Sequence, residues 1–500
     1  MSSDVVLAQG VFATAESDPL RPALVTPQHA LTYRQLRNQI INYALRLHSH
    51  GVDRTSCVAL SLASPIPALT TIFALSLLGA RWIVASESSL EQAQRLGITH
   101  RCIGAAEGGT PGPGLIYISP LWHSSPPGRS ENLHFEGYAS PDDVFMVAQS
   151  SGTTGMPKFM TISARMMKWG LGAFDTVFER ASARARNPYP TLSPLFPVTT
   201  VGGSALCLCV LAKHGTVVFG HDYETWTANG TDIVAGSPAQ AAAILDGLPV
   251  PPSPEVQSLL VFGSQIGRAF LQRALLFFDR VDNRYGSTEA WGATEKTLTS
   301  EDDDVDSAGS ALPGVTVEIV DDDDVLLQSG TEGIVRVRAP MHVPGYMDDP
   351  EATARAFRGG WFYAGDLGLM SESGELYVTG RVDDRLNLGG TKINASFIDR
   401  VVGDFDGVAD AMCFTEQGPS GIAMLSIVAR ATGDIDHAEL ARMIGTGIAK
   451  YAGGAETLGN LYFADSVPRN TNGKVVRRAA LEAIRGIAPL RMNRVSDPGP

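Results

Sequence analysis

The stretch that decides the fold reads Gln149-Ser150-Ser151-Gly152-Thr153-Thr154-Gly155-Met156-Pro157-Lys158. It follows an apolar run, residues 144–148, whose length and composition predict a buried strand. Its glycines allow conformations in which backbone N–H groups turn toward one point, and its hydroxyls and lysine add donors there. Such a loop suits an anion, above all a phosphate chain. The spacing is not that of a Walker A loop, and the loop alone also fits a polar surface turn.

Bulk composition limits the possible partners. The chain has 500 residues, which predicts two or more domains, and 44% of them are hydrophobic, as in an ordinary globular protein. The net charge of -14 disfavours nucleic acid and anionic membranes as main partners, because both attract basic surfaces. An anionic ligand would therefore be held by local donors.

Cysteine usage and the N-terminus predict a cytoplasmic protein. The five cysteines are Cys57, Cys102, Cys207, Cys209 and Cys413. Their odd number and scattered positions are typical of a reducing compartment, with thiols filling cores. The first residues carry no basic-then-apolar signal peptide. Residues 55–80 lack charge, but Pro65 and Pro67 interrupt them, which favours a strand and a buried helix over a membrane span.

The order of patterns predicts an α/β chain with a large N-terminal domain of layered, mostly parallel sheets and helices. Strand patterns at residues 57–62, 82–85, 217–219, 233–234 and 259–262 alternate with helix patterns at 68–78 and 90–96, among others. Residues 104–137, rich in Gly, Pro and Ser, predict a long surface loop. From Gly309 a period of two predicts an antiparallel β-rich subdomain.

The predicted domains are residues 1–382, which form the core, residues 383–488, which form a small mobile α+β domain, and a disordered tail at 489–500.

Five motifs occur in order over almost the whole chain. They are the loop Ser150–Lys158, the run Tyr285–Glu289 (Tyr-Gly-Ser-Thr-Glu), the run Gly360–Asp366, the run Gly380–Arg385 with its continuation Gly389–Ile393, and the run Pro468–Lys474. One motif alone is weak, whereas five in sequence are specific. The chain resembles the adenylate-forming superfamily of acyl- and aryl-CoA synthetases, peptide-synthetase adenylation domains and luciferase-like enzymes.

The resemblance implies that a carboxylate attacks the α-phosphate of ATP and pyrophosphate leaves, so the site needs fixed donors and a metal. It implies that the loop Ser150–Lys158 contacts the β- and γ-phosphates, Thr288 the α-phosphate, and Glu289 a Mg²⁺ ion, which a hard carboxylate suits. Tyr285 would stack on adenine and Asn283 would bind its amino edge. Gly263, Ser264, Arg284, Gly286 and Lys392 would also lie around the nucleotide.

Two further motifs extend this implied site. Asp366 resembles the carboxylate that accepts the ribose hydroxyls, and Arg381 resembles the arginine beside it. Taken singly, such residues also serve as turn aspartates, interface ion pairs or residues that bond their own loop.

The resemblance also gives the C-terminal domain two tasks. Lys474 would bridge the attacking carboxylate and the α-phosphate, as a compact cation on a flexible stem can, although a surface lysine is the alternative. Asp383 would be the hinge about which this domain rotates between half-reactions. Gly390 matches the glycine that lines a pantetheine tunnel, which implies a thiol acceptor, either CoA or an acyl carrier protein.

Several positions depart from the family pattern. Phe159 follows the loop lysine, where glycine is usual, and Pro197 follows Phe196, where many CoA ligases have histidine and amino-acid-activating relatives have aspartate. Pro197 therefore argues against α-amino acids as substrates. Gly286 stands where acetyl-specific relatives have tryptophan, which leaves room for a larger acyl or aryl group.

Phe196, Gly286 and Trp291 are the predicted acyl-pocket residues. Arg284 would recognise a polar or anionic substituent there, or instead face solvent or the phosphates.

The sequence thus predicts an AMP-forming acid–thiol ligase that uses ATP, Mg²⁺ and the pantetheine thiol of CoA or of a carrier protein. A non-catalytic nucleotide-binding paralogue is the alternative. The missing histidine at Pro197 favours that alternative, and the retained Glu289, Asp366, Arg381 and Lys474 oppose it.

Overall fold

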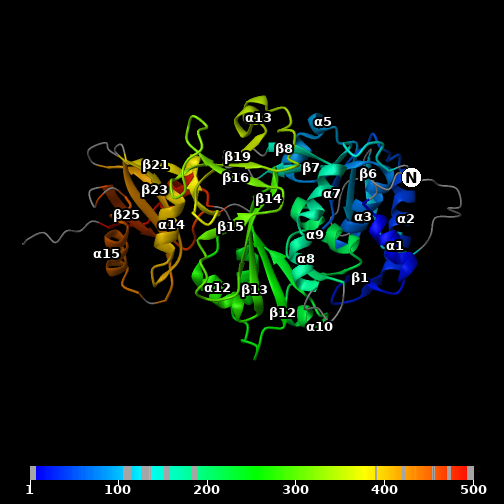
Figure 1. Cartoon of the computed structure of the whole chain (residues 1–500), viewed down its shortest axis with the longest axis horizontal. Helices are drawn as coiled ribbons and strands as arrows, with labels where there is room; N and C mark the ends of the chain where they lie inside the picture. Colours follow the sequence, from blue (N-terminus) through cyan, green and yellow to red (C-terminus); the bar gives the residue numbers. More distant parts are fainter. Residues whose placement is uncertain are drawn as a thin grey trace, which may run out of the picture. The chain divides into compact units, whose positions relative to one another are not determined.

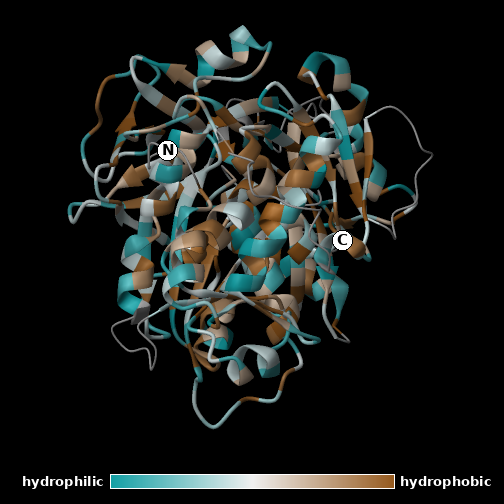
Figure 2. Cartoon of the chain, turned by 90° about the vertical axis from the view of Figure 1, so that its right-hand side faces the viewer, coloured by the Kyte–Doolittle hydropathy of each residue, from teal (hydrophilic) through white to brown (hydrophobic). Residues whose placement is uncertain are grey.

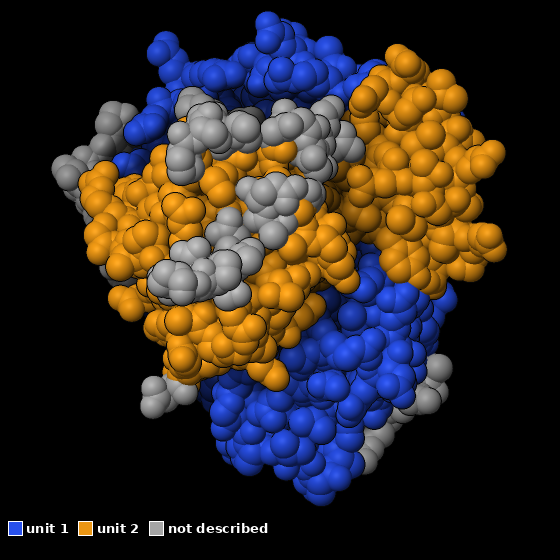
Figure 3. Space-filling view, turned by 90° about the vertical axis from the view of Figure 1, so that its left-hand side faces the viewer, with its two compact units in different colours: residues 1–317, 337–362 blue, residues 318–336, 363–500 orange. Residues whose placement is uncertain are grey.

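The computed structural model describes residues 7–104, 114–124, 135, 137–150, 158–182, 189–388, 391–418, 423–433, 435–452, 454, 457–469 and 475–492. The chain forms two compact units, coloured separately in Figure 3. The first comprises residues 1–317 and 337–362, and the second comprises residues 318–336 and 363–500. This division differs from the boundary expected at Asp383, which stays a prediction.

One sheet of the first unit contains, among the described residues, six strands in the order β6-β5-β3-β4-β7-β8. Their bounds are β3 Cys57–Ser61, β4 Arg81–Val84, β5 His100–Gly104, β6 Leu115–Ile118, β7 Val144–Ser150 and β8 Lys158–Ser163. The pairs are parallel except for β7 with β8, which is antiparallel. The strand predicted before the central loop is therefore β7, and the loop connects β7 to β8.

The second sheet of this unit has the order β15-β14-β13-β12-β11-β9-β10-β1-β2. The bounds are β1 Pro22–Val25, β2 Ala30–Thr32, β9 Thr191–Pro194, β10 Thr216–Val218, β11 Ile233–Gly236, β12 Val256–Phe262, β13 Phe278–Ser287, β14 Trp291–Leu298 and β15 Ser307–Ala311. From β1 through β10, β9, β11 and β12 to β13 the pairing is parallel, and β13-β14-β15 is antiparallel. The mixed α/β class predicted from the sequence is thus confirmed.

Helices cover these sheets (Figure 1). Their bounds are α1 Gln9–Ser17, α2 Tyr33–Ser49, α3 Pro65–Leu78, α4 Glu87–Glu91, α5 Ala93–Leu96, α6 Leu121–Ser124, α7 Ala164–Gly172, α8 Asp175–Ser182, α9 Val201–Ala212, α10 Tyr223–Ala228, α11 Pro238–Leu245, α12 Arg268–Leu275 and α13 Pro350–Ala356, the last followed by the short strand β18 Phe357–Arg358. The main core joins apolar residues of α2, α3 and α9 to residues of both sheets. In Figure 2 several helices carry both hydrophobic and hydrophilic colours, as expected for helices with one face on a core.

Capping explains where α2 begins. The Thr32 side chain accepts a hydrogen bond from the Gln35 backbone N–H, and the Gln35 side chain accepts one from the Thr32 backbone N–H. This reciprocal pair satisfies two donors that a helix start leaves free. Thr32 is thus the N-cap of α2.

The second unit holds most of β16 Thr316–Val320, β17 Gly333–Arg338 and β19 Trp361–Met370, together with β20 Glu375–Arg381. A 3-10 turn, η1 Val382–Asp384, leads to the hairpin β21 Arg385–Leu388 and β22 Thr391–Asn394. A further sheet, β23-β24-β25-β26, follows, with bounds β23 Val408–Gln417, β24 Ala423–Ala431, β25 Leu458–Phe463 and β26 Leu490–Arg491. Its helical elements are α14 Ala395–Gly403, α15 His437–Ile448, η3 Arg477–Ala479 and α16 Ala480–Ala483.

Three local predictions need correction. Residues 104–137 are not all loop, because Leu115–Ile118 forms β6 beside β5 and Leu121–Ser124 forms α6. The helix predicted at 90–96 is two short helices, α4 and α5. The C-terminal fold continues past Ala488, since β26 pairs with β25 and Met492 is buried in the core of that unit.

The five cysteines are all buried and unpaired. Burial raises the pKa of the Cys102 and Cys209 thiols to about 12. They fill cores, as the sequence predicts. Within the described residues, no helix is both long and apolar enough to cross a membrane.

Candidate active site

Several predicted site residues of the first unit follow the carboxyl ends of strands of its second sheet. β9, β11, β12 and β13 are parallel, so their carboxyl ends lie at the same edge. Phe196 follows β9, Gly263 and Ser264 follow β12, and the turn Thr288–Glu289 follows β13. Ligands of open α/β sheets bind at this edge, and the topology therefore brings together motifs that are far apart in the sequence.

Tyr346 contacts both Lys158, at the start of β8 in the first sheet, and Glu289, in the turn after β13 of the second sheet. Its hydroxyl donates to Glu289 Oε1 at 3.0 Å, and the Lys158 ammonium lies 4.7 Å from the centre of its ring. One side chain therefore orients the expected metal carboxylate and also supports the expected phosphate lysine through a cation–π contact. Sequence reasoning missed Tyr346, because nothing in Val-Pro-Gly-Tyr, residues 343–346, specifies contacts with residues so distant in the chain.

Tyr346 belongs to a segment, residues 343–347, that we call the bridging segment. At one end Val343 N donates to Glu289 O at 2.9 Å, and at the other Met347 N donates to Phe159 O at 2.7 Å. The bridging segment thus ties the Glu289 turn to β8. Phe159, which departs from the family pattern, contributes its carbonyl here.

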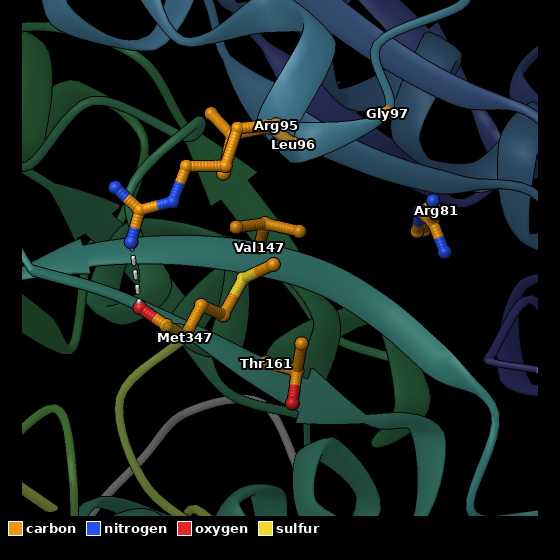
Figure 4. Close-up of a pocket in the computed structure, with 7 residues that line it drawn as sticks. All are labelled: Arg81, Arg95, Leu96, Gly97, Val147, Thr161 and Met347. Atoms are coloured by element: carbon orange, nitrogen blue, oxygen red, sulfur yellow. Dashed lines mark hydrogen bonds between the residues drawn. The ribbon is translucent and has the colours of Figure 1, made fainter. Parts of the chain in front are cut away.

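A small pocket beside the bridging segment shows how its far end is fixed (Figure 4). Arg95 Nη2 donates to Met347 O at 3.1 Å, and Arg95 Nε pairs with Asp348 at 2.6 Å. The apolar floor includes Val147 of β7. The pocket therefore belongs to the support of the bridging segment.

The central loop itself is described only at its base. Ser150 and Lys158 are opposite each other in the antiparallel pair β7–β8, so the two ends of the loop lie side by side. The other predicted phosphate contacts, Ser151, Gly152, Thr153, Thr154 and Gly155, lie outside the described residues.

The hairpin β13–β14 carries the run Asn283–Glu289. Asn283 is buried, and Tyr285 and Thr288 are half-buried. A Cβ at Gly286 would overlap the Trp291 carbonyl oxygen, at a shift in the strand register. Glycine is therefore needed at position 286 so that the two strands of the hairpin can approach each other. The predicted place of Gly286 beside an acyl group stays a prediction.

Trp291 adopts a left-handed backbone conformation, with φ of 64°. Bulky residues rarely adopt this conformation, and such strain concentrates at functional sites. Phe196, the other predicted pocket aromatic, stacks on Phe262 with ring centres 4.7 Å apart, while Pro197 is exposed.

Arg284 is buried and pairs with Glu295 of the neighbouring strand β14, its Nε lying 3.0 Å from Oε2. The alternative of a solvent-facing arginine is therefore wrong. Glu295 is the residue opposite Arg284 in the antiparallel register. The sequence offered no signal for this pair, because it depends on the hairpin's length and bulge.

In the second unit, Asp366 of β19 lies opposite Arg381 of β20. Asp366 is buried, and its Oδ1 accepts a hydrogen bond from Arg381 Nη1 at 2.7 Å. The ion pair orients the carboxylate.

Asp383 lies in the turn η1, and Lys392 lies in β22, which follows it. Asn394, at the end of β22, donates to the Thr379 carbonyl and caps α14. A Cβ at Gly380 would overlap that amide, which explains the glycine. Gly390 lies outside the described residues.

Lys474 also lies outside the described residues, but the base of its loop is defined. Arg469 and Val475 form an antiparallel bridge, and Val476 N donates to Pro468 O at 2.9 Å. Arg469 Nε also pairs with Asp410 at 2.9 Å. The residues on either side of the Lys474 motif thus lie next to each other.

The described part of the chain contains no group of three His, Cys, Asp or Glu side chains that could hold a metal ion. Glu289 alone fits Mg²⁺, which commonly uses one or two carboxylates together with substrate phosphates and water.

The chain is similar to known proteins in sequence and in fold. Residues 113–347 match the family model described as AMP-binding enzyme. The chain is 25% identical to the 2-succinylbenzoate–CoA ligase of Geobacillus sp. (strain WCH70), over 96% of this chain and 97% of that protein. It is 26% identical to a 4-chlorobenzoate–CoA ligase of Arthrobacter sp., over 80% of each chain.

Among solved structures, the O-succinylbenzoate coenzyme A synthetase of Bacillus subtilis in complex with ATP and magnesium ion has the same fold. The TM-score is 0.79, with 20% identity, over 94% of this chain and 98% of that one. The family model covers the central loop, the Tyr285–Glu289 run and the bridging segment. By these matches residues 113–347 form an AMP-binding enzyme domain, and over most of its length the chain is similar to acid–CoA ligases.

Proposed function

We propose that the protein is an AMP-forming acid–thiol ligase. It activates a carboxylic acid with ATP, releases pyrophosphate, and transfers the acyl group to the thiol of CoA. The observation that carries this proposal is the joint contact of Tyr346 with Lys158 and Glu289, beside the carboxyl ends of β12 and β13. Relatives named as aryl–CoA ligases support the same reaction class.

Different residues of the chain would bind the phosphates, the metal ion and the carboxylate substrate. Lys158 and the hairpin loop it closes would hold the leaving phosphates, and Thr288 would contact the α-phosphate where negative charge builds up. Glu289, held by Tyr346, would hold Mg²⁺, which neutralises phosphate charge when bound. Lys474 would contact the attacking carboxylate.

In the second unit, Asp366 would accept the ribose hydroxyls. Arg381 orients this carboxylate by donating to its Oδ1. A carboxylate has two acceptor oxygens, which suits the two hydroxyls of a diol.

The acceptor and the setting are finer parts of the proposal. CoA is the expected acceptor, and a carrier-protein pantetheine thiol would present the same reacting group. The cytoplasm is the expected setting, because five buried, unpaired thiols suit a reducing compartment. The non-catalytic alternative rests on Pro197 alone.

The test is ATP–pyrophosphate exchange with a panel of carboxylic acids, followed by thioester formation with CoA or with a pantetheinylated carrier protein. Exchange that depends on both the acid and Mg²⁺ would support the ligase. Glu289→Gln should abolish exchange with an unchanged melting temperature, because it keeps the size and loses the charge that Mg²⁺ needs. Glu224→Gln, at an exposed glutamate of α10, is the matched control. Nucleotide binding without exchange by any acid would favour the paralogue.

A further inference from the structure

A charged cluster is buried on the hairpin β13–β14. Asp282 is fully buried and accepts hydrogen bonds from Ser258 at 2.5 Å, Thr297 at 2.7 Å and Arg280 at 3.0 Å. Arg180 of α8 lies 3.3 Å from the second oxygen of Asp282. Asp282 is thus saturated with donors.

Glu295 is shared between two arginines. Arg284 donates to Oε2 through Nε and Nη2, and Arg180 donates to Oε1. The cluster therefore sets three guanidinium groups, those of Arg180, Arg280 and Arg284, against two carboxylates. Arg180 is the one whose side chain water reaches appreciably, at 38% exposure. An excess positive charge remains beside Arg284, which is 4% exposed.

Three buried donors of this hairpin lack acceptors in the described part of the chain: Arg280 Nη2, Arg284 Nη1 and Trp291 Nε1. The last two lie on the part of the hairpin next to the run that ends at Glu289. Buried N–H groups without acceptors cost free energy and are rare in native proteins. Both residues are more than nine-tenths buried. A purely structural cluster would be expected to satisfy both donors.

Trp291 is fixed by its surroundings. Its ring fills the space that a side chain at Gly170 would need, and it packs edge-to-face on Trp169 with ring centres 6.4 Å apart. The Arg284 guanidinium lies over the Phe174 ring, two residues beyond the end of α7, and the Trp291 ring lies against Trp169 and Gly170 of α7. Both side chains thus face the same segment of the chain.

The two donors also lie next to the proposed chemistry. Trp291 pairs with Ser287 and Gly292 with Gly286, in the run that ends at Glu289. The Arg284 guanidinium lies 5.0 Å from the centre of the Phe174 ring, so an apolar surface borders the charge.

We infer that Arg284 and Trp291 form a subsite for an anionic group on the substrate's acyl part, so that the activated acid is a dicarboxylic acid. This inference rests on the proposed function. The carboxylate remote from the reacting centre accepts from Arg284 Nη1 and Trp291 Nε1 and balances the excess charge. Phe174 borders the carbon chain near that carboxylate.

The experiment uses matched acid pairs in which one carboxylate of the dicarboxylic acid is replaced by a methyl group, such as terephthalate with 4-methylbenzoate and glutarate with pentanoate. The readout is kcat/KM in ATP–pyrophosphate exchange. The native protein should prefer the dicarboxylic member of at least one pair by about tenfold or more, because the buried donors would otherwise stay unpaired.

Three variants locate the preference. Arg284→Met with Glu295→Gln removes both charges of the pair together, and the preference should fall below about threefold. Trp291→Phe keeps most of the ring without the N–H and should reduce the preference by several-fold. Arg273→Met is the matched control. Arg273 is a half-buried arginine of α12, and it donates to the Leu245 and Leu248 carbonyls instead of to a residue of the hairpin β13–β14. It should leave the preference unchanged.

Direct binding of each acid, measured by calorimetry without ATP, separates this inference from the proposed function. Exchange without a dicarboxylate preference, or with a preference that survives both the double variant and Trp291→Phe, overturns the subsite and leaves the ligase standing. Dicarboxylate binding that these variants abolish, without exchange by any acid, supports the subsite and overturns the ligase. Absence of both exchange and binding overturns both. If the double variant fails to fold, Trp291→Phe decides.

Discussion

Replacing Tyr346 by phenylalanine tests the most specific contact in the candidate site. The change removes the hydroxyl that donates to Glu289 at 3.0 Å and keeps the ring beneath the Lys158 ammonium. A hydrogen bond to a charged group contributes about 1.5–3 kcal/mol. We take about 1.5 kcal/mol, because water can replace part of the bond at a site open to substrate. That value corresponds to about a tenfold loss in kcat/KM.

The assay is ATP–pyrophosphate exchange over a range of Mg²⁺ concentrations. Tyr346→Phe should need more Mg²⁺ for half-maximal rate, because Glu289 is less well oriented. Tyr346→Leu should lose a further several-fold, since it also removes a cation–π contact worth about 0.5–1 kcal/mol. Tyr138→Phe, which removes a hydroxyl bonded to the Ala80 carbonyl, is the control. Activity and Mg²⁺ midpoint of Tyr346→Phe within about twofold of native would refute this account of the site.

Four other substitutions test the structure and the family resemblance. Burial raises the pKa of Asp232 from 3.8 to about 6, so its carboxyl stabilises the fold below pH 4 and loses that contribution as pH rises through about 6. Asp232→Asn should therefore gain stability relative to native between pH 4.5 and pH 8, by about 1–2 kcal/mol in urea unfolding, and a constant difference would contradict the assignment. Gly286→Ala should cost about 1–3 kcal/mol and most of the exchange activity, because its Cβ would overlap the Trp291 carbonyl; a native melting temperature would count against this. Lys474→Ala should lose ATP–pyrophosphate exchange yet form thioester from supplied acyl-adenylate. Asp383→Pro should keep exchange and lose thioester formation. Equal losses in both steps for both variants would contradict the assignment of the two residues to different half-reactions.

The sequence predicted the layered α/β architecture because strand and helix patterns alternate strongly in the first unit. The strand before the central loop, the capped start of α2 and the β-rich region after Gly309 all follow from local patterns. The strand Leu115–Ile118 was missed because four apolar residues among glycines and prolines carry little signal. It is a strand because β5 offers it a parallel partner, which only the tertiary structure reveals.

The candidate site was predictable where motifs are contiguous and not where contacts are distant. The runs around Glu289 and Asp366 are visible in the sequence, and the roles assigned to them stay predictions. Tyr346 could not be found, since its contacts connect residues 158, 289 and 346. Gly286 was interpreted as open space, but the Trp291 backbone approaches it closely.

The burial of all five cysteines makes the folded chain a convenient background for site-specific chemistry. Thiol-reactive dyes attack the thiolate, and the pKa of Cys102 and Cys209 near 12 keeps those side chains protonated at neutral pH. Cys57, Cys207 and Cys413 are equally enclosed, and burial raises the pKa of each of them too. A cysteine introduced at an exposed position, such as Glu224 or Glu439, would react first. Fluorophores can thus be attached one per unit, and energy transfer between them followed during turnover, without removing any native cysteine.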